Sequence, residues 1–397
     1  MLLLFAKTSA VNAQPVADNT STLQSHYIDY ESVKRLIDYA SQPSLCGRVS
    51  DRLFGRARCI ESPERNFSLQ GEVGVAYTQW TSAVVVGSAV CGFRIGADKE
   101  IAPLSYSSFV VMASLTGFYR LDGRLKLRPS NRDCIDVEVG VASMPTKFWG
   151  IGDAAQRHSV AGGFREDDLR VKVGYMRHIA GCLSLGLGVH YLWLRARECD
   201  SLAMLYMAEA GCDDAELGVG GVGFIAKFED RLRQENPLDG IALQVRYALY
   251  PSIVGTKGGA WWQFEATMNY FKSVWQGGLL AMEVYADAWS CSSSWLLWPR
   301  LGGEHRMRGY YYGRYVDSTL VATQVELRQK IYRALSGVAW VGAGSVVSSL
   351  DKVDIDSILP SYGIGLRLRV GEGVLLRADY GFGRNSNGLI ISVNEAF

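Results

Sequence analysis

The chain has 397 residues, of which 48 % are hydrophobic and 20 % charged, and its net charge is +1. So small a net charge excludes the global positive field by which a protein attracts nucleic acid, and we expect no nucleic-acid partner. No apolar run reaches the roughly eighteen residues of a membrane-spanning helix. The chain is rich in Gly, Tyr and Trp and poor in Pro, a composition typical of long, tightly turning β-strands.

The first fourteen residues, MLLLFAKTSAVNAQ, place a short apolar run before small residues, as at the end of a secretory signal peptide. The usual cationic start is missing, and a disordered terminus is the alternative. Residues 15–66 are predicted to be a short periplasmic extension, with a helix over Ser32–Tyr39. We interpret this extension as a solvated tether, the alternatives being a plug in a barrel lumen or a basic contact with lipid headgroups.

From about residue 67 the hydrophobic residues alternate with polar ones, which is the period of β-strands and not of helices. In 182–193, for example, Leu183, Leu185 and Leu187 share one face, and Ser184 and Gly186 share the other. The alternation predicts sixteen strands: 68–79, 83–95, 104–116, 119–129, 133–142, 168–178, 182–194, 218–228, 240–250, 258–271, 278–290, 318–329, 332–345, 360–370, 373–382 and 388–395.

A soluble sandwich also alternates, but three features favour an all-β transmembrane antiparallel β-barrel over 67–397. The predicted strands are long, their polar face carries full charges, and long connections (143–167, 195–217, 291–317) fall on one rim with tight turns on the other. The predicted setting is therefore the bacterial outer membrane, in contact with its lipid and reached by export. The last strand places Leu389, Ile391 and Phe397 on the lipid side, and a terminal aromatic is the usual insertion signal of such barrels.

Several segments resemble the BamA/TamA-type outer-membrane assembly barrels of the bacterial surface-antigen superfamily. The central one is Met307-Arg308-Gly309-Tyr310, which resembles the motif of that family's sixth extracellular loop and follows the eleventh predicted strand. Further matches accompany it at Gln324–Arg328, Pro360–Arg367, Arg377–Gly383 and Asn394–Phe397, and a weaker one lies upstream at Phe148–Gly152.

The resemblance implies that the loop folds back into the lumen and that Arg308 binds acidic side chains on the inner wall. By alternation Glu326 and Asp379 point inward, and an Arg inside a barrel needs carboxylate partners. Two departures weaken the resemblance to full assembly factors. The family's Phe-x-Asp-x-Gly strand reads Trp340–Gly344 here, without the acid, and 15–66 is too short for a POTRA repeat. The implied role is insertion or export of envelope components through a labile seam between the first and last strands, with envelope proteins as clients.

Two other functions stay open: a passive channel and a structural surface protein. The channel is suggested by charges on the predicted lumen face: Arg170, Lys172, Arg246, Arg367, Arg369 and Arg377. We predict no enzyme, cofactor or metal site, because Gly218–Gly223 enters a strand instead of opening a helix and the five His lack ligand spacing. The close pairs Cys46/Cys59 and Cys199/Cys212 could be disulfides or free thiols.

Overall fold

The computed structural model describes residues 67–95, 103–152, 155, 158–212, 214–231, 239–253, 260–332, 334–370, 374–393 and 395–397. The predicted signal segment 1–14, the extension 15–66 with its helix, and the pair Cys46/Cys59 lie outside these residues. Among the described residues, no helix has the length and apolar character needed to cross a membrane.

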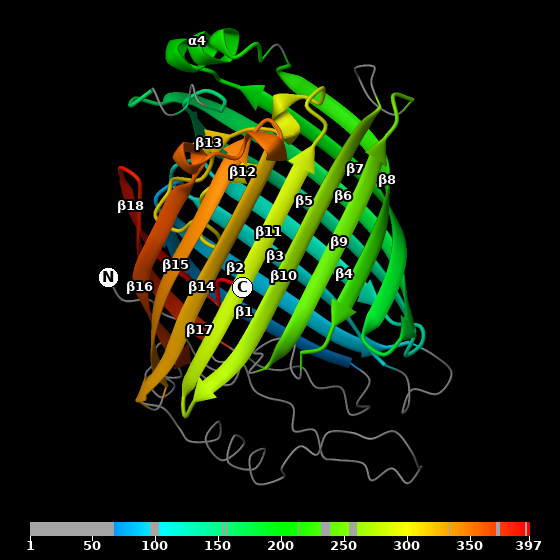
Figure 1. Cartoon of the computed structure of the whole chain (residues 1–397). Coiled ribbons are helices and arrows are strands. Elements are labelled where there is room, and N and C mark those ends of the chain that lie inside the picture. The colour runs from blue at the N-terminus through cyan, green and yellow to red at the C-terminus, as the bar shows by residue number, and fades with distance from the viewer. Residues whose placement is uncertain are drawn as a thin grey trace, which may run out of the picture.

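In the described part of the chain, sixteen antiparallel strands close into one barrel, each paired with its neighbours in sequence and β1 with β18 (Figure 1). This confirms the predicted fold class. The barrel strands are β1 Phe67–Thr78, β2 Ser82–Arg94, β3 Leu104–Ser114, β4 Tyr119–Leu127, β5 Asp133–Phe148, β6 Gly162–Ala180, β7 Leu183–Arg197, β8 Glu216–Glu229, β9 Gly240–Tyr250, β10 Trp261–Trp275, β11 Gly278–Trp289, β14 Thr319–Tyr332, β15 Leu335–Val347, β16 Leu359–Val370, β17 Val374–Gly383 and β18 Ser386–Val393.

The two faces of the barrel follow directly from the alternation in sequence. Phe109, Leu187 and Ile364 are 50, 67 and 67 % exposed, and such large apolar side chains recur around the outside. The alternate positions carry charged side chains that face inward, among them Glu326 and Asp379, both fully buried. An apolar exterior around a polar interior is the arrangement of a barrel that sits in lipid, where closure satisfies every backbone group. The chain therefore has the fold of an outer-membrane protein.

Strands β5 and β6 extend beyond their predicted ends, and the predicted loop 143–167 is wrong over about half of its length. Their ladder continues from Met144 opposite Glu166 to Phe148 opposite Gly162. Pro145 interrupts the sequence pattern, but β4 pairs with β5 only as far as Ser143. Pro145 thus lies where β5 has a neighbour on one side only, the place in a sheet where a missing N–H is tolerated.

The rim that carries these extensions also holds a helix, α4 (Ser201–Glu209), within the predicted loop 195–217 (Figure 1). Asp200 caps it, its carboxylate accepting hydrogen bonds from the Ala203 and Gly163 amides, both at 2.7 Å. Because 16 strands bring residues 67 and 393 to the opposite rim, we take the α4 rim as the extracellular one. Cys199 beside the helix is a free thiol, so no Cys199–Cys212 disulfide is formed in this structure.

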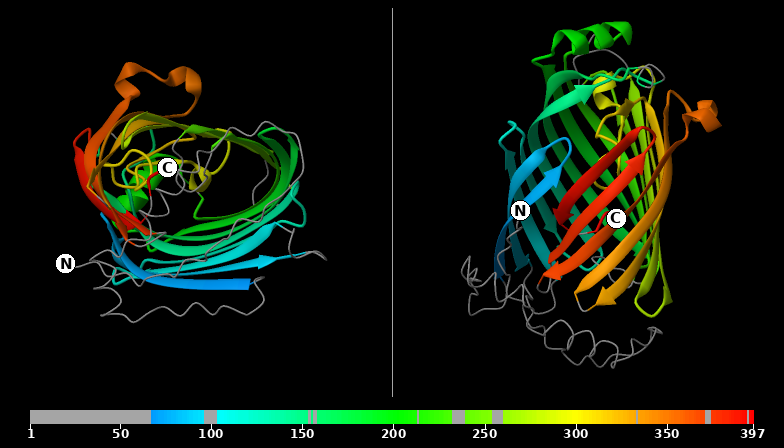
Figure 2. Two further views of the ribbon diagram at one scale, coloured as in Figure 1. Left: turned by 90° about the horizontal axis from the view of Figure 1, so that it is seen from below. Right: turned by 90° about the vertical axis from the view of Figure 1, so that its left-hand side faces the viewer.

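The connection from β11 to β14 runs inside the barrel outline, as Figure 2 shows in the view from below. It comprises the 3₁₀ turn η1 (Trp295–Leu297), the short strands β12 (Arg300–Leu301) and β13 (Tyr315–Val316), and residues 302–314 between them, here called the inner loop. Two further 3₁₀ turns, η2 (Leu350–Lys352) and η3 (Ile355–Ser357), connect β15 to β16.

Candidate functional site: a loop bound to the inner wall

Arg308 is the centre of the inner loop, and its side chain is completely buried against the barrel wall. Its Nη1 donates a hydrogen bond to Asp379 Oδ2 on β17 at 2.8 Å, and its Nη2 donates to Glu326 Oε2 on β14 at 2.9 Å. The structure therefore brings together the arginine and the two carboxylates named from the sequence. A guanidinium held by two carboxylates from different strands fixes both the position and the orientation of the loop.

A second arginine shares the same carboxylates. Arg367 on β16 contacts Asp379 at 2.5 Å, Glu326 at 3.3 Å and Glu395 at 2.8 Å. Arg328 adds a contact to Glu326 at 3.2 Å. Three arginines and three carboxylates thus form one connected network on the lumen wall. Buried charges persist only when they are paired and hydrogen-bonded, and each carboxylate here has more than one cationic partner.

The ring of Trp340 lies against the open face of the Arg308 guanidinium, 3.8 Å from its Cζ. In sequence, 340–344 stands out only as the strand that lacks the family's acid. The position of that acid is Gly342, where a Cβ would lie 2.8 Å from the Thr323 carbonyl oxygen. This strand therefore supports Arg308 through an aromatic face instead of a carboxylate.

The backbone of the inner loop lies flat on β17 because glycines leave room for it. Gly309 has φ +106, and a Cβ there would lie 2.8 Å from the backbone of Gly381 and Phe382. A Cβ on Gly381 would lie 2.7 Å from the Arg308 backbone, and one on Gly383 would lie 2.4 Å from the Tyr310 ring. Both strand and loop thus need glycine where they touch.

Hydrogen bonds fix the loop backbone in this place. Ser361 and Ser386 hydroxyls donate to the carbonyl oxygens of Arg308 and Gly309 at 2.7 and 2.6 Å. The Tyr310 hydroxyl donates to the Pro360 carbonyl oxygen at 2.7 Å and accepts from the Arg384 amide at 2.6 Å. Burial raises the pKa of Tyr310 to about 12, which keeps this hydroxyl protonated and able to donate.

The next residues of the loop contact the first hairpin of the barrel. Tyr311 and Tyr312 lie 6.3 and 6.4 Å, centroid to centroid, from Trp80 in the turn between β1 and β2. Trp149, from the family-like segment Phe148–Gly152, packs on the other side of Tyr311 at 5.5 Å. The inner loop thus contacts β17 and the β17–β18 turn through residues 308–310, and the β1–β2 turn through residues 311 and 312.

The closure of the barrel lies between these two points of contact. Within the described residues, β1 and β18 are registered only at Tyr77 opposite Ile391, whereas β1 and β2 pair along their whole length, from Phe67–Phe93 to Thr78–Ser82. The Gln79 side-chain amide also donates to the Asn387 carbonyl oxygen across this seam. Figure 2 shows the seam from the side, with blue β1 beside red β18.

The prediction that Phe397 continues the lipid-facing side of the last strand is wrong. Strand β18 ends at Val393, and residues 395–397 turn into the lumen. There Phe397 packs on Phe271 of β10, with ring centroids 6.3 Å apart, and its carbonyl oxygen accepts from Arg328 at 3.1 Å. Glu395 belongs to the arginine network. The cause is tertiary: two buried arginines attract the carboxylate, and a buried apolar patch accepts the ring.

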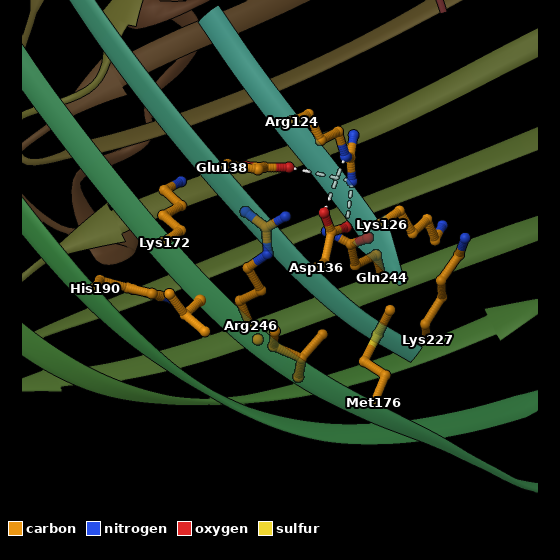
Figure 3. Close-up of a pocket in the computed structure, with 13 residues that line it drawn as sticks. Arg124, Lys126, Asp136, Glu138, Lys172, Met176, His190, Lys227, Gln244 and Arg246 are labelled. Carbon is orange, nitrogen blue, oxygen red and sulfur yellow. Dashed lines mark hydrogen bonds and ion pairs between the residues drawn. The ribbon is translucent and has the colours of Figure 1, made fainter. Parts of the chain in front are cut away.

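The opposite half of the lumen holds a small cavity bordered by β4 to β9, shown in Figure 3. Of the charges that suggested a channel, Lys172 and Arg246 line it. Arg170 is bound to Asp168 at 2.9 Å instead. Arg367 and Arg377 are almost fully buried, Arg367 in the network around Arg308 and Arg377 against Glu304 of the inner loop at 3.4 Å. The predicted lumen charges therefore divide between a bound loop and a more open region.

Sequence reasoning missed three members of the site, namely Trp340, Arg328 and Glu395. Arg328 could have been found, because it lies two positions after Glu326 on the inward face of the same strand. Glu395 could not, because its alternation pattern continues that of β18 and carries no sign of the turn into the lumen.

The same barrel arrangement occurs in solved structures. BamA from Haemophilus ducreyi lacking POTRA domains 1–3 superposes with a TM-score of 0.55 at 12 % identity, covering 91 % of this chain and 81 % of that one. CdiB from Escherichia coli gives a TM-score of 0.57 at 13 % identity, covering 84 % and 64 %. The chain has the fold of BamA- and CdiB-type barrels.

CdiB from Acinetobacter baumannii gives a similar result, with a TM-score of 0.54 at 10 % identity and coverage of 83 % of this chain and 59 % of that one. The chain thus spans less than two thirds of either CdiB. Neither a protein-family model nor a curated protein sequence matches it. At these identities the likeness to BamA/CdiB-type barrels is one of fold.

Proposed function

We propose that this outer-membrane barrel inserts or exports other envelope components through the seam between β1 and β18. The proposal rests on how the barrel closes. Among the described residues, β1 and β18 form one registered residue pair, whereas β1 and β2 form twelve. A strand edge that is not paired along its length presents backbone N–H and C=O groups that another strand can bind. An incoming strand can satisfy such groups by adding to the exposed edges, the mode of binding known as β-augmentation.

A seam that opens also requires that the rest of the barrel keeps its shape. The inner loop can provide this support. Residues 308–310 are fixed to β17, to the β17–β18 turn and to β14 by the Arg308 network and by the serine hydrogen bonds. Tyr311 and Tyr312 meet the β1–β2 turn through aromatic contacts with Trp80. Side-chain ring contacts of this kind are weaker than a buried charge network, so the β1 side is the side expected to move.

A disulfide across the seam tests the proposal directly. In a background with the native cysteines replaced by serine, Tyr77→Cys with Ile391→Cys joins β1 to β18 at their registered pair. The matched control, Val75→Cys with Val85→Cys, joins β1 to β2 at a registered pair on the same outer face. We expect the seam disulfide to abolish complementation of a deletion strain, and a reductant to restore it, while the control complements under both conditions.

The clients are identified by the outer-membrane proteome and lipid content of the deletion strain. Selective loss of particular barrels or surface proteins supports insertion or export and names what is moved. An unchanged outer membrane, or full activity of the seam-locked variant, contradicts the proposal.

A further inference from the structure

The cavity bordered by β4 to β9 is lined by more basic than acidic side chains, and the proposed opening of the seam gives no reason for this excess. Its volume is about 90 Å³, enough for a tetrahedral oxyanion with some water. Five of its lining side chains are basic and two are acidic: Arg124, Lys126, Lys172, Lys227 and Arg246 against Asp136 and Glu138. Figure 3 shows these side chains around one space, contributed by several neighbouring strands.

Both acidic residues are already engaged by one cation. Arg124 contacts Asp136 through Nε at 3.0 Å and Nη2 at 2.5 Å, and its Nη2 also lies 3.1 Å from Glu138. Figure 3 shows these contacts as the dashed lines on one side of the cavity. The carboxylates on the lining therefore neutralise Arg124 and leave the other four cations without a partner on the lining.

Carboxylates from outside the lining neutralise only part of this excess. Arg246 binds Glu265 at 3.0 Å. Lys227 binds Glu229 at 3.1 Å, but Glu229 also binds Arg231. Within the described part of the chain Lys126 and Lys172 have no ion pair, although Lys172 stands opposite Glu138 in the ladder of β5 and β6. The five cations of the lining, together with Arg231 outside it, thus meet four carboxylates.

We propose that this cavity is a binding site for a phosphate group. Two lysines without an ion pair around a small space are unfavourable by themselves, because like charges repel, and a phosphate that carries nearly two negative charges at neutral pH offsets them. Lysine ammonium groups bind phosphate as point charges, and Arg246 can donate further N–H bonds. Lys126 on β4 and Lys172 on β6 lie on different strands, so they approach a bound ion from two sides.

The test uses the full chain, folded in detergent micelles at low salt, and titrates inorganic phosphate against the protein by calorimetry. The variants are Lys126→Gln and Lys172→Gln, with Lys172→Arg as the charge-preserving variant. Lys272→Gln is the control, because Lys272 has a 57 % exposed side chain on β10 and lies outside the lining. The difference in gel mobility between folded and heated barrel reports that each variant folds.

We expect the wild-type chain and Lys272→Gln to bind alike, each lumen Lys→Gln change to weaken binding by about tenfold, and Lys172→Arg to restore it. A parallel titration with a phosphorylated monosaccharide separates the two sources of the group. Tighter binding of the sugar phosphate assigns the site to a phosphorylated solute, and tighter binding of inorganic phosphate assigns it to the free ion. The proposal is overturned if neither binds, or if the folded Lys126→Gln and Lys172→Gln variants bind as well as the wild-type chain.

Discussion

The ring of Trp80 meets the ring of Tyr311 edge to face, at an interplanar angle of 76° and a centroid distance of 6.3 Å. Trp80 stands in the turn that follows β1, and Tyr311 follows the residues that bind β17. This contact therefore links the two sides of the seam through the inner loop. The contact contributes less free energy than the charge network at Arg308. A single substitution can remove it without disturbing a buried charge.

Trp80→Ala is expected to loosen the inner loop from the β1–β2 turn and leave its attachment to β17 intact. The loss is about 1 kcal/mol for the ring contact, in addition to the area exposed. Limited proteolysis of the folded barrel in micelles should show faster cleavage near Arg314, while the melting temperature changes little. Trp262→Ala, which removes a ring from the outer face, is the control. Equal cleavage of both variants would contradict the bridging role.

Arg308→Ala is expected to destabilise the barrel by about 3 kcal/mol or more, because Glu326 and Asp379 lose one of their buried cationic partners. Arg308→Lys should recover part of the lost stability, because it keeps the positive charge. The recovery should be incomplete, because one ammonium group cannot bind both carboxylates as the planar guanidinium does. The comparison is Arg120→Ala, whose partner Asp122 forms a half-exposed pair worth at most about 1 kcal/mol. Urea titration followed by heat-modifiable gel mobility measures all three. Similar midpoints for Arg308→Ala and Arg120→Ala would exclude the anchoring role.

Gly381→Ala is expected to displace the inner loop, because the new methyl group would lie 2.7 Å from the Arg308 backbone, which hydrogen bonds and the charge network hold in place. Gly87→Ala on β2 is a matched control, since a Cβ there meets nothing within 4 Å. Protease protection of the inner loop reports the difference. If both alanine variants keep the loop fully protected, the close contact between loop and strand is not needed for its position.

Phe397→Ala is expected to release the C-terminal residues from the lumen. The ring is only partly buried on Phe271, so the loss is about 2 kcal/mol, less than for a core phenylalanine. Carboxypeptidase should then digest the folded variant faster than the wild-type chain. Phe382→Ala, which removes a ring from the lipid face of β17, should leave the digestion rate unchanged. A wild-type rate for Phe397→Ala would show that the ring is not needed and that the polar contacts of the tail with Arg367 and Arg328 hold it.

The cap of α4 is expected to respond to acid. Hydrogen bonds from the backbone of Ala203 and Gly163 lower the pKa of Asp200 below its usual value. The folded state therefore favours the carboxylate, and its stabilisation of α4 is present above pH ~4 and is lost as the pH falls through the lowered pKa. Hydrogen exchange of the α4 amides at falling pH should show this loss. Asp200→Asn, which keeps the cap without the charge, should remove the pH dependence, and Asp200→Ala should cost about 1 kcal/mol at neutral pH.

The barrel could be predicted because lipid and lumen require opposite polarities at alternate residues of every strand. The prediction failed for segments that lie beyond the lipid, where alternation is no longer required. There, β5 and β6 continue as a ladder whose charged residues, such as Glu166 and Asp167, form ion pairs with arginines instead of following the alternation, so in sequence they look like loop residues. The helix α4 could have been found from Asp200 as a cap followed by Leu202, Ala203 and Met204.

The candidate site was only partly predictable for a related reason. Alternation gives the face of Glu326 and Asp379, and the resemblance gives the importance of Arg308. Neither gives the distance between them, which depends on the path of the inner loop. The inward turn of residues 395–397 depends on partners far away in sequence, such as Phe271 and Arg328, and a local pattern carries no trace of such partners.

The network at Arg308 also has a consequence for the order of folding. Its partners lie 18 and 71 positions away in the chain, whereas the closing pair, Tyr77 and Ile391, is separated by most of the sequence. The entropy lost on closing a loop rises with its length, so the contacts of the inner loop with β14 and β17 are the less costly to form. The C-terminal third of the chain can therefore assemble around the inner loop first, and the remaining strands then curl around a half-barrel whose interior is already occupied.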